Sequence, residues 1–120
     1  MANGTIPRIN QFESFISIDL IINSTENNAP ERLLNNWSVL TEYVKRFSLK
    51  KDYYTTFTGI IHFPAYNGST NFGTYLVYGI LNQSNDKGSV ILTPYYLSNE
   101  IWKICKTEST AIYKITTTTI

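Results

Sequence analysis

Residues 53–120 decide the fold, and they open with YYTTFTGIIHF (residues 53–63) and TYLVYGIL (residues 74–81). Tyrosine, isoleucine, valine, threonine and phenylalanine suit a pleated, half-buried surface, whereas glycine, asparagine and aspartate suit tight turns. Small polar turns separate the apolar segments, which predicts a run of short strands. The predicted strands are Tyr53–Phe63, Thr74–Leu81, Ser89–Leu97, Glu100–Lys106 and Thr110–Ile120.

Two further elements are predicted before this run. Phe15–Ile22 alternates between apolar and mixed positions, which indicates a strand with one dry face. Pro30–Phe47 carries large apolar residues at helical spacing, and Asn28 is a suitable N-cap for such a helix. The alternative is that Ser38–Leu49 forms a strand. If the helix forms, we expect Trp37 to anchor it on the sheet.

The sequence therefore predicts an α+β fold rich in β structure. We expect an antiparallel sheet or small sandwich of about six strands, packed by one amphipathic helix. Residues 1–120 fit a single domain, with 1–13 as an extended arm, 14–52 as the strand and helix, and 53–120 as a β-rich module. Pro94 removes a backbone donor, so its strand is expected to be an edge, bulged or split.

Composition excludes several classes of function. The formal net charge of +1 excludes a whole-molecule electrostatic footprint for nucleic acid. A single cysteine, Cys105, excludes an internal disulfide framework and a cysteine zinc cage. No apolar stretch is long enough for a transmembrane helix, so no membrane insertion is expected. The first eight residues lack the basic and apolar regions of a secretory signal.

No catalytic set, metal site or cofactor is predicted. The single histidine, His62, is expected to be half-buried in a strand, and Cys105 to be a small buried apolar side chain. The carboxylates are scattered without suggestive spacing, and there is no glycine-rich phosphate loop. Gly59 and Gly79 lie inside strand patterns, where glycine marks a bulge or close packing. The chain is therefore expected not to be an enzyme.

The aromatic residues are the candidate contact residues. Tyr75 and Tyr78 have opposite parity along their strand, so both faces of the sheet are expected to carry aromatics. The helix can cover one face, which leaves the other for a partner subunit or a ligand. Tyrosine suits interfaces because its body is apolar and its hydroxyl forms hydrogen bonds. The candidates are Tyr53, Tyr54, Tyr75, Tyr78, Tyr95, Tyr96, Trp102 and Tyr113.

The order of four segments carries a family resemblance. They are NFGTYLVYG (residues 71–79), GSVILT (residues 88–93), NEIWKI (residues 99–104) and AIYKI (residues 111–115). This pattern resembles the C-terminal modules of bacteriophage tail and head fibres and related virion appendages. Unlike those proteins, the chain carries no coiled coil or shaft. None of its residues matches a family position of known chemical role.

The resemblance implies a non-enzymatic structural or attachment protein of a virion. A capsid decoration, a head-fibre component and a tail or baseplate component all fit. It also implies a homotrimer and other virion proteins as partners. Independently of the resemblance, the tyrosine and Asn/Thr side chains of the C-terminal sheet could make weak contacts with a host-surface glycan, by aromatic stacking and amide hydrogen bonds. The alternative is a small intracellular viral protein that binds and inhibits a host defence protein. The two interpretations place the chain in the virion and in the host cytoplasm, respectively.

Overall fold

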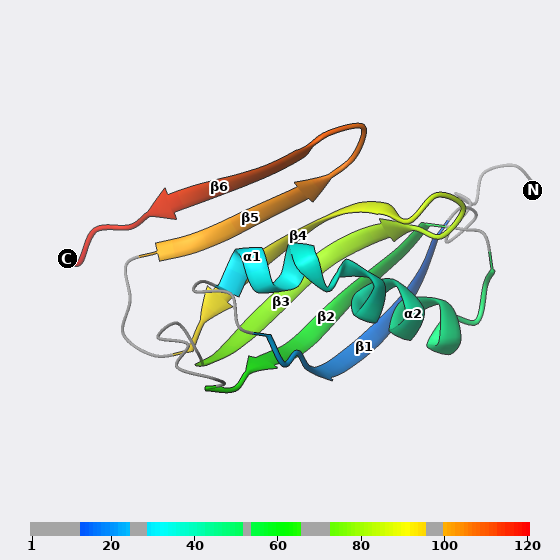
Figure 1. Ribbon diagram of the computed structural model, residues 1–120, viewed down its shortest axis with the longest axis horizontal. Coiled ribbons are helices and arrows are strands. Elements are labelled where there is room, and N and C mark those ends of the chain that lie inside the picture. Colours follow the sequence, from blue (N-terminus) through cyan, green and yellow to red (C-terminus); the bar gives the residue numbers. More distant parts are fainter. Residues whose placement is uncertain (1–12, 25–28, 52–53, 66–72, 96–99) are drawn as a thin grey trace, which may run out of the picture.

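The computed structural model describes residues 13–24, 29–51, 54–65, 73–95 and 100–120. These residues form six strands and two helices (Figure 1). In chain order they are β1 (Glu13–Ile21), α1 (Ala29–Asn35), α2 (Trp37–Phe47), β2 (Tyr54–Phe63), β3 (Gly73–Asn82), β4 (Lys87–Pro94), β5 (Glu100–Lys106) and β6 (Thr110–Thr116). The predicted β-rich α+β class is confirmed.

All six strands form one sheet, in the spatial order β1-β2-β3-β4-β5-β6. The strands β1 and β2 pair in parallel, whereas every later pair is antiparallel. A parallel pair needs a crossover connection, and the two helices lie in that connection. The expectation of an antiparallel sheet or a sandwich is therefore corrected to one open, mixed sheet.

The predicted single helix is interrupted at Asn36. The backbone of Asn36 has φ −122° and ψ 32°, outside the helical region. The Asn36 side chain donates from Nδ2 to the carbonyl oxygen of Arg32 at 2.8 Å, and its own carbonyl accepts from Val39 at 3.0 Å. Asparagine competes with the helical backbone in this way. The expectation of one helix is thus corrected to two, while the strand alternative for Ser38–Leu49 is wrong.

Other boundaries also differ from expectation. The segment β4 is an interior strand that ends at Pro94, beyond its last pair with β5 at Leu92 and Trp102. Because Pro94 lies beyond the last β4–β5 pair, its missing N–H removes no hydrogen bond between these two strands. The last strand ends at Thr116, before its predicted end at Ile120. The proposed N-cap Asn28 and most of the proposed 1–13 arm lie outside the described residues.

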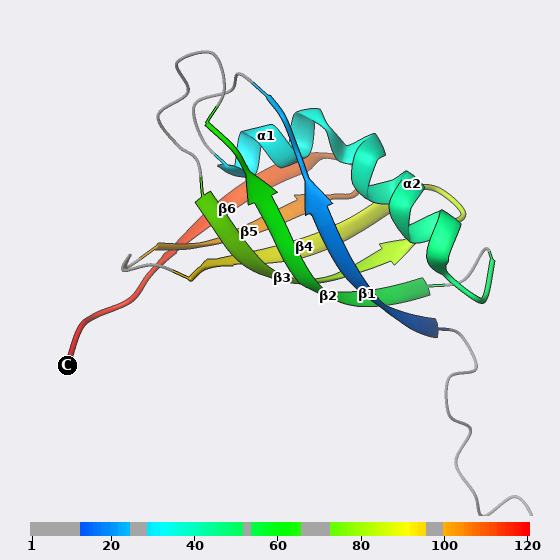
Figure 2. The same ribbon diagram turned by 90° about the horizontal axis from the view of Figure 1, so that it is seen from below.

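Both helices cover the same face of the sheet, and the core lies between this face and the helices (Figure 2). Inward-facing residues alternate along each strand, as Phe57 and Ile61 do in β2 and Val90 and Leu92 in β4. Leu33, Leu40 and Val44 of the helices are fully buried against them. Hydrophobic burial of this one face holds the two layers together.

A buried arginine joins α1 to the ends of the parallel strands. Arg32 is fully buried, and its Nη2 donates to the carbonyl oxygens of Ile22 at 3.1 Å and Pro64 at 2.7 Å. Its guanidinium also lies 5.4 Å from the centroid of the Phe63 ring, a cation–π distance. These contacts satisfy carbonyl groups just beyond β1 and β2 and fix the helix layer against them.

Candidate functional site

Among the described elements, no helix covers the opposite face of the sheet. This surface, termed the open face, consists of the alternate strand residues that point away from α1 and α2. Its large apolar side chains are exposed, with Tyr78 at 60% and Leu76 at 56%. The exposed apolar residues on this face are Phe15, Ile21, Tyr54, Ile60, Leu76, Tyr78, Ile80, Ile91, Tyr113 and Ile115. Large exposed apolar surfaces are typical of contact sites in proteins.

Cross-strand register places these side chains in rows. In the central row, Tyr78 lies between Thr58 of β2 and Ile91 of β4. The same row continues through Lys103 to Tyr113 at the far edge. Directly opposed residues on one sheet face are in side-chain contact range. At the other edge, Ser17 of β1 pairs with Thr58, so the open face is one continuous surface across all six strands.

The open face becomes a hollow near one end of β2 and β3. A cavity of about 250 Å³ lies there, lined by Ile60, Thr74, Tyr75, Leu76 and Tyr95. Tyr95 follows β4 and is 75% exposed. Beside the cavity, His62 Nδ1 lies 2.7 Å from the hydroxyl oxygen of Thr74. The hollow can receive an apolar side chain from a partner.

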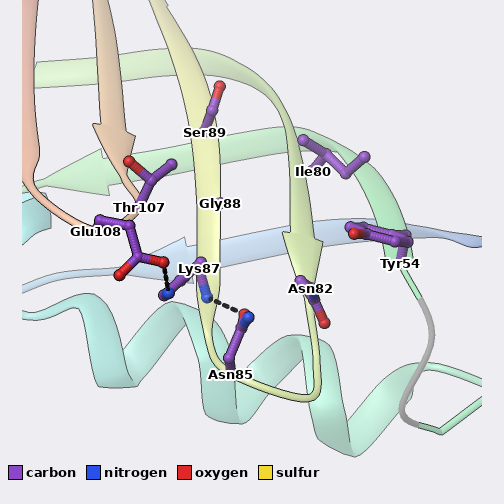
Figure 3. Close-up of a pocket in the computed structure, with 9 residues that line it drawn as sticks. All are labelled: Tyr54, Ile80, Asn82, Asn85, Lys87, Gly88, Ser89, Thr107 and Glu108. Atoms are coloured by element: carbon purple, nitrogen blue, oxygen red, sulfur yellow. Dashed lines mark hydrogen bonds and ion pairs between the residues drawn. The ribbon is translucent and has the colours of Figure 1, made fainter.

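A second cavity lies at the other end of the open face, between the β3–β4 and β5–β6 turns (Figure 3). It has a volume of about 340 Å³ and is lined by Tyr54, Ile80, Asn82, Asn85, Lys87, Gly88, Ser89, Thr107 and Glu108. The Oδ1 atoms of Asn82 and Asn85 accept from backbone N–H groups two residues onward, at 3.0 and 3.1 Å. Such turns leave the Nδ2 group of each side chain for other contacts.

An ion pair between Lys87 and Glu108 closes one side of this second cavity (Figure 3). The hydrogen bond from Lys87 and its positive charge both lower the pKa of the Glu108 carboxyl. The pair joins the first residue of β4 to the β5–β6 turn. Glu108 is therefore a carboxylate acceptor at the rim of the cavity at neutral pH.

Few charges lie on the open face. Among the side chains that the structure describes there, the aspartates, glutamates and lysines are Asp19, Lys87 and Lys103. Lys103 Nζ lies 5.9 Å from the centroid of the Tyr113 ring. Asp19 has no ion-pair partner within the described part of the chain. Its exposed carboxylate and the exposed Lys103 thus lie near opposite edges of the sheet.

The predicted aromatic candidates separate into two layers. Tyr54, Tyr78 and Tyr113 lie on the open face, and Tyr95 lines the apolar cavity. Tyr75 lies in the core instead, 6% exposed, with its ring 5.5 Å from that of Phe63. Trp102 also packs against the core. The remaining two candidates, Tyr53 and Tyr96, lie outside the described residues.

The aliphatic part of the open face was not singled out from sequence. It includes Ile60, Leu76, Ile80 and Ile91. Each of these residues is followed directly by a buried apolar residue. Pairs of adjacent apolar residues within a predicted strand could therefore have revealed this part of the face. Two adjacent apolar residues in a strand must point to opposite faces. Their pairing predicts apolar surface on both sides of the sheet.

The residues considered for chemistry are dispersed. His62 is half-buried in β2, as predicted. Cys105 is half-buried in β5, where a buried side chain was expected. Within the described ranges, no group of three or more histidine, cysteine, aspartate or glutamate residues could hold a metal ion. No described helix has the length and apolar character needed to cross a membrane.

Comparison of the chain with protein-family models, with curated proteins and with solved structures finds no significant match.

Proposed function

We propose that the chain is a non-enzymatic assembly protein that buries the open face of its sheet against protein, as a structural or attachment component of a virion. The main support for this proposal is that the apolar side chains of Tyr78 and Leu76 are exposed at the centre of the sheet. Exposed aromatic and aliphatic side chains in a contiguous patch favour burial in an interface. The virion setting rests on the resemblance of the C-terminal strands to fibre modules.

The alternative is an intracellular viral protein that inhibits a host protein. The same face would then cover a foreign target. The response to added protein separates the two roles. A virion component is expected to associate further into larger symmetric assemblies with other virion proteins, whereas an inhibitor is expected to stay monomeric or dimeric and to gain mass only when its host target is added.

Two leucine substitutions test the use of the open face. Leu76 lies on this face, whereas Leu49 follows α2, outside the sheet, and is 95% exposed. We expect Leu76→Ser to reduce the association seen by light scattering behind a sizing column, and Leu49→Ser to leave it unchanged. Both variants should keep the wild-type circular dichroism spectrum. An equal response of association to both substitutions would contradict the proposal.

The cavity beside Lys87 and Glu108 supports glycan contact as a second candidate function. A sugar is bound by stacking on an aromatic ring and by hydrogen bonds from a few placed polar groups. Tyr54 supplies an aromatic ring, and Asn82 and Asn85 supply amide donors. The volume of about 340 Å³ falls in the range of small-ligand pockets.

Binding to a neutral glycan array tests this second function. Tyr54→Ala and Asn82→Ala should each weaken any captured glycan, while Tyr95→Ala, at the other cavity, should not. Binding that all three variants retain would place the glycan elsewhere. An absence of binding by the wild-type chain to any glycan would remove this candidate.

A further inference from the structure

We infer that the open face is self-complementary, and that two copies of the chain pack through it around a two-fold axis parallel to the strands. In this dimer, Asp19 of each copy faces Lys103 of the other. The inference rests on the proposed use of the open face and identifies its first partner as a second copy of the chain.

The open face is large enough for a specific dimer. Six strands with a spacing of about 4.8 Å and roughly eight residues each, rising about 3.3 Å, cover on the order of 600 Å². Two such faces bury on the order of 1,200 Å², at the lower end of specific protein interfaces. Sheets stack face to face about 10 Å apart with their strands nearly aligned, so two open faces can form a sandwich.

The distribution of charge selects one arrangement of that sandwich. Asp19 lies on β1, the first edge strand, and Lys103 lies on β5, next to the other edge. An axis in the plane of the interface and perpendicular to the strands would place β1 over β1 of the second copy. The two Asp19 carboxylates would then approach each other, and so would the two Lys103 ammonium groups. Like charges across an interface oppose association.

An axis parallel to the strands, between β3 and β4, instead places β1 over β6 of the second copy. The second copy's β5 then lies next to that position. Asp19 belongs to the row of Ile60 and Leu76, and Lys103 to the next row, with Tyr78 and Ile91. Asp19 and the second copy's Lys103 are then offset by one strand and one row. An extended lysine side chain can span that offset. The two symmetry-related ion pairs form together, because a two-fold interface repeats each contact.

The remaining composition of the face agrees with burial in a sandwich. Tyr78 and Ile91 occupy the centre of the face, and Asp19 and Lys103 lie toward its edges. Interfaces commonly have an apolar centre and a polar rim. The third charged residue of the face, Lys87, is the first residue of β4, next to the β3–β4 turn. It forms an ion pair with Glu108 of its own chain. It therefore brings no unpaired charge into the contact.

Charge reversal tests the dimer. Asp19→Lys and Lys103→Asp should each weaken the wild-type dimer by at least about tenfold in Kd, because each creates two like-charge contacts. The double variant restores opposite charges, and its Kd should return to within about threefold of wild type. Glu42→Lys, on the exposed side of α2, makes the same charge change as Asp19→Lys away from the face and should have no effect. Sedimentation equilibrium gives each Kd.

Mixing the two single variants provides the second measurement. An Asp19→Lys copy and a Lys103→Asp copy form two attractive contacts with each other, although each repels its own kind. An equimolar mixture should therefore dimerise with an affinity close to wild type. A variant damaged in folding would not recover on mixing, so this result separates a lost charge contact from a lost fold.

Several outcomes would overturn the dimer. They are a monomeric wild-type chain, a trimer as the fibre resemblance implies, and single variants with unchanged mass. Failure of the mixture to recover would also do so. An oligomer that responds to Leu76→Ser but not to charge reversal would refute this dimer and leave the proposed function standing. An oligomer that responds to neither would refute both.

Discussion

The indole Nε1 of Trp37 donates a 2.7 Å hydrogen bond to the carbonyl oxygen of Asp86. This contact joins the first residue of α2 to the β3–β4 turn, 49 residues later in the chain. Asp86 has φ 61°, a left-handed conformation that aspartate tolerates better than most residues. Its carboxylate also pairs with Lys45 near the end of α2, at 2.5 Å. The turn is thus held against both ends of one helix.

Trp37→Ala should lower the free energy of unfolding by about 3–5 kcal/mol, since Trp37 is 5% exposed and fills space between α2 and the sheet. Trp37→Phe is the matched variant, because it keeps an aromatic ring and removes the hydrogen bond to Asp86. It should cost less than the alanine variant, with about 1 kcal/mol for the lost hydrogen bond. Urea unfolding followed by circular dichroism gives both values. A loss below about 1 kcal/mol for Trp37→Ala would show that the side chain does not anchor the helix.

Gly59→Ala should destabilise the parallel strand pair. Gly59 has φ +153°, and a Cβ atom there would lie 2.0 Å from the carbonyl oxygen of Ile18 on β1. The added methyl group must push β1 away from β2 and hold a strained backbone, at a cost of at least about 2 kcal/mol. Ile60→Ala, one residue onward on the open face, is the control and should cost less. Thermal unfolding that ranks the two in the opposite order would contradict this account.

Arg32→Met should lower the free energy of unfolding by roughly 2–5 kcal/mol. The substitution keeps most of the apolar volume but leaves the carbonyl oxygens of Ile22 and Pro64 without their donor. Arg32→Lys should also destabilise, because a single ammonium group cannot reproduce the planar fork of guanidinium donors. Chemical denaturation measures both variants. Retention of wild-type stability by Arg32→Lys would mean that the charge, and not the donor geometry, is what matters.

The pKa of Glu108 should rise to its ordinary value in Lys87→Met, because Lys87 supplies the hydrogen bond and the charge that lower it. A lowered folded-state pKa means that the carboxylate adds stability above the unfolded-state pKa. That contribution is lost as pH falls through the folded-state pKa. We expect it to be small, since Glu108 is exposed. NMR titration of the Glu108 carboxyl checks the shift, and an unchanged pKa in Lys87→Met would refute the assignment.

Local sequence patterns predicted much of the secondary structure. The alternation of Phe15–Ile22 and the aromatic, β-branched content of residues 53–120 placed all six strands close to their observed bounds. The opposite parity of Tyr75 and Tyr78 also predicted their separation, with Tyr75 in the core and Tyr78 on the open face. These features depend on neighbouring residues, whose directions follow from backbone geometry alone.

The break at Asn36 shows where local reasoning was insufficient. The apolar stripe of α1 and α2 continues on both sides of Asn36, so periodicity predicted one uninterrupted helix. The hydrogen bond of Asn36 to Arg32 and the burial of Arg32 against β1 and β2 accompany this break. Such a break depends on what the helices pack against.

The sequence by itself determined the strand-rich class, the amphipathic helical segment and the presence of aromatic side chains on both faces of the sheet. Only the tertiary structure decided that β1 pairs in parallel with β2, that both helices cover one face, and that Asp19 and Lys103 lie near opposite edges of the other. Side-chain direction is set residue by residue along a strand. Strand order and register, in contrast, depend on contacts between segments far apart in the chain, which the burial of one shared core selects.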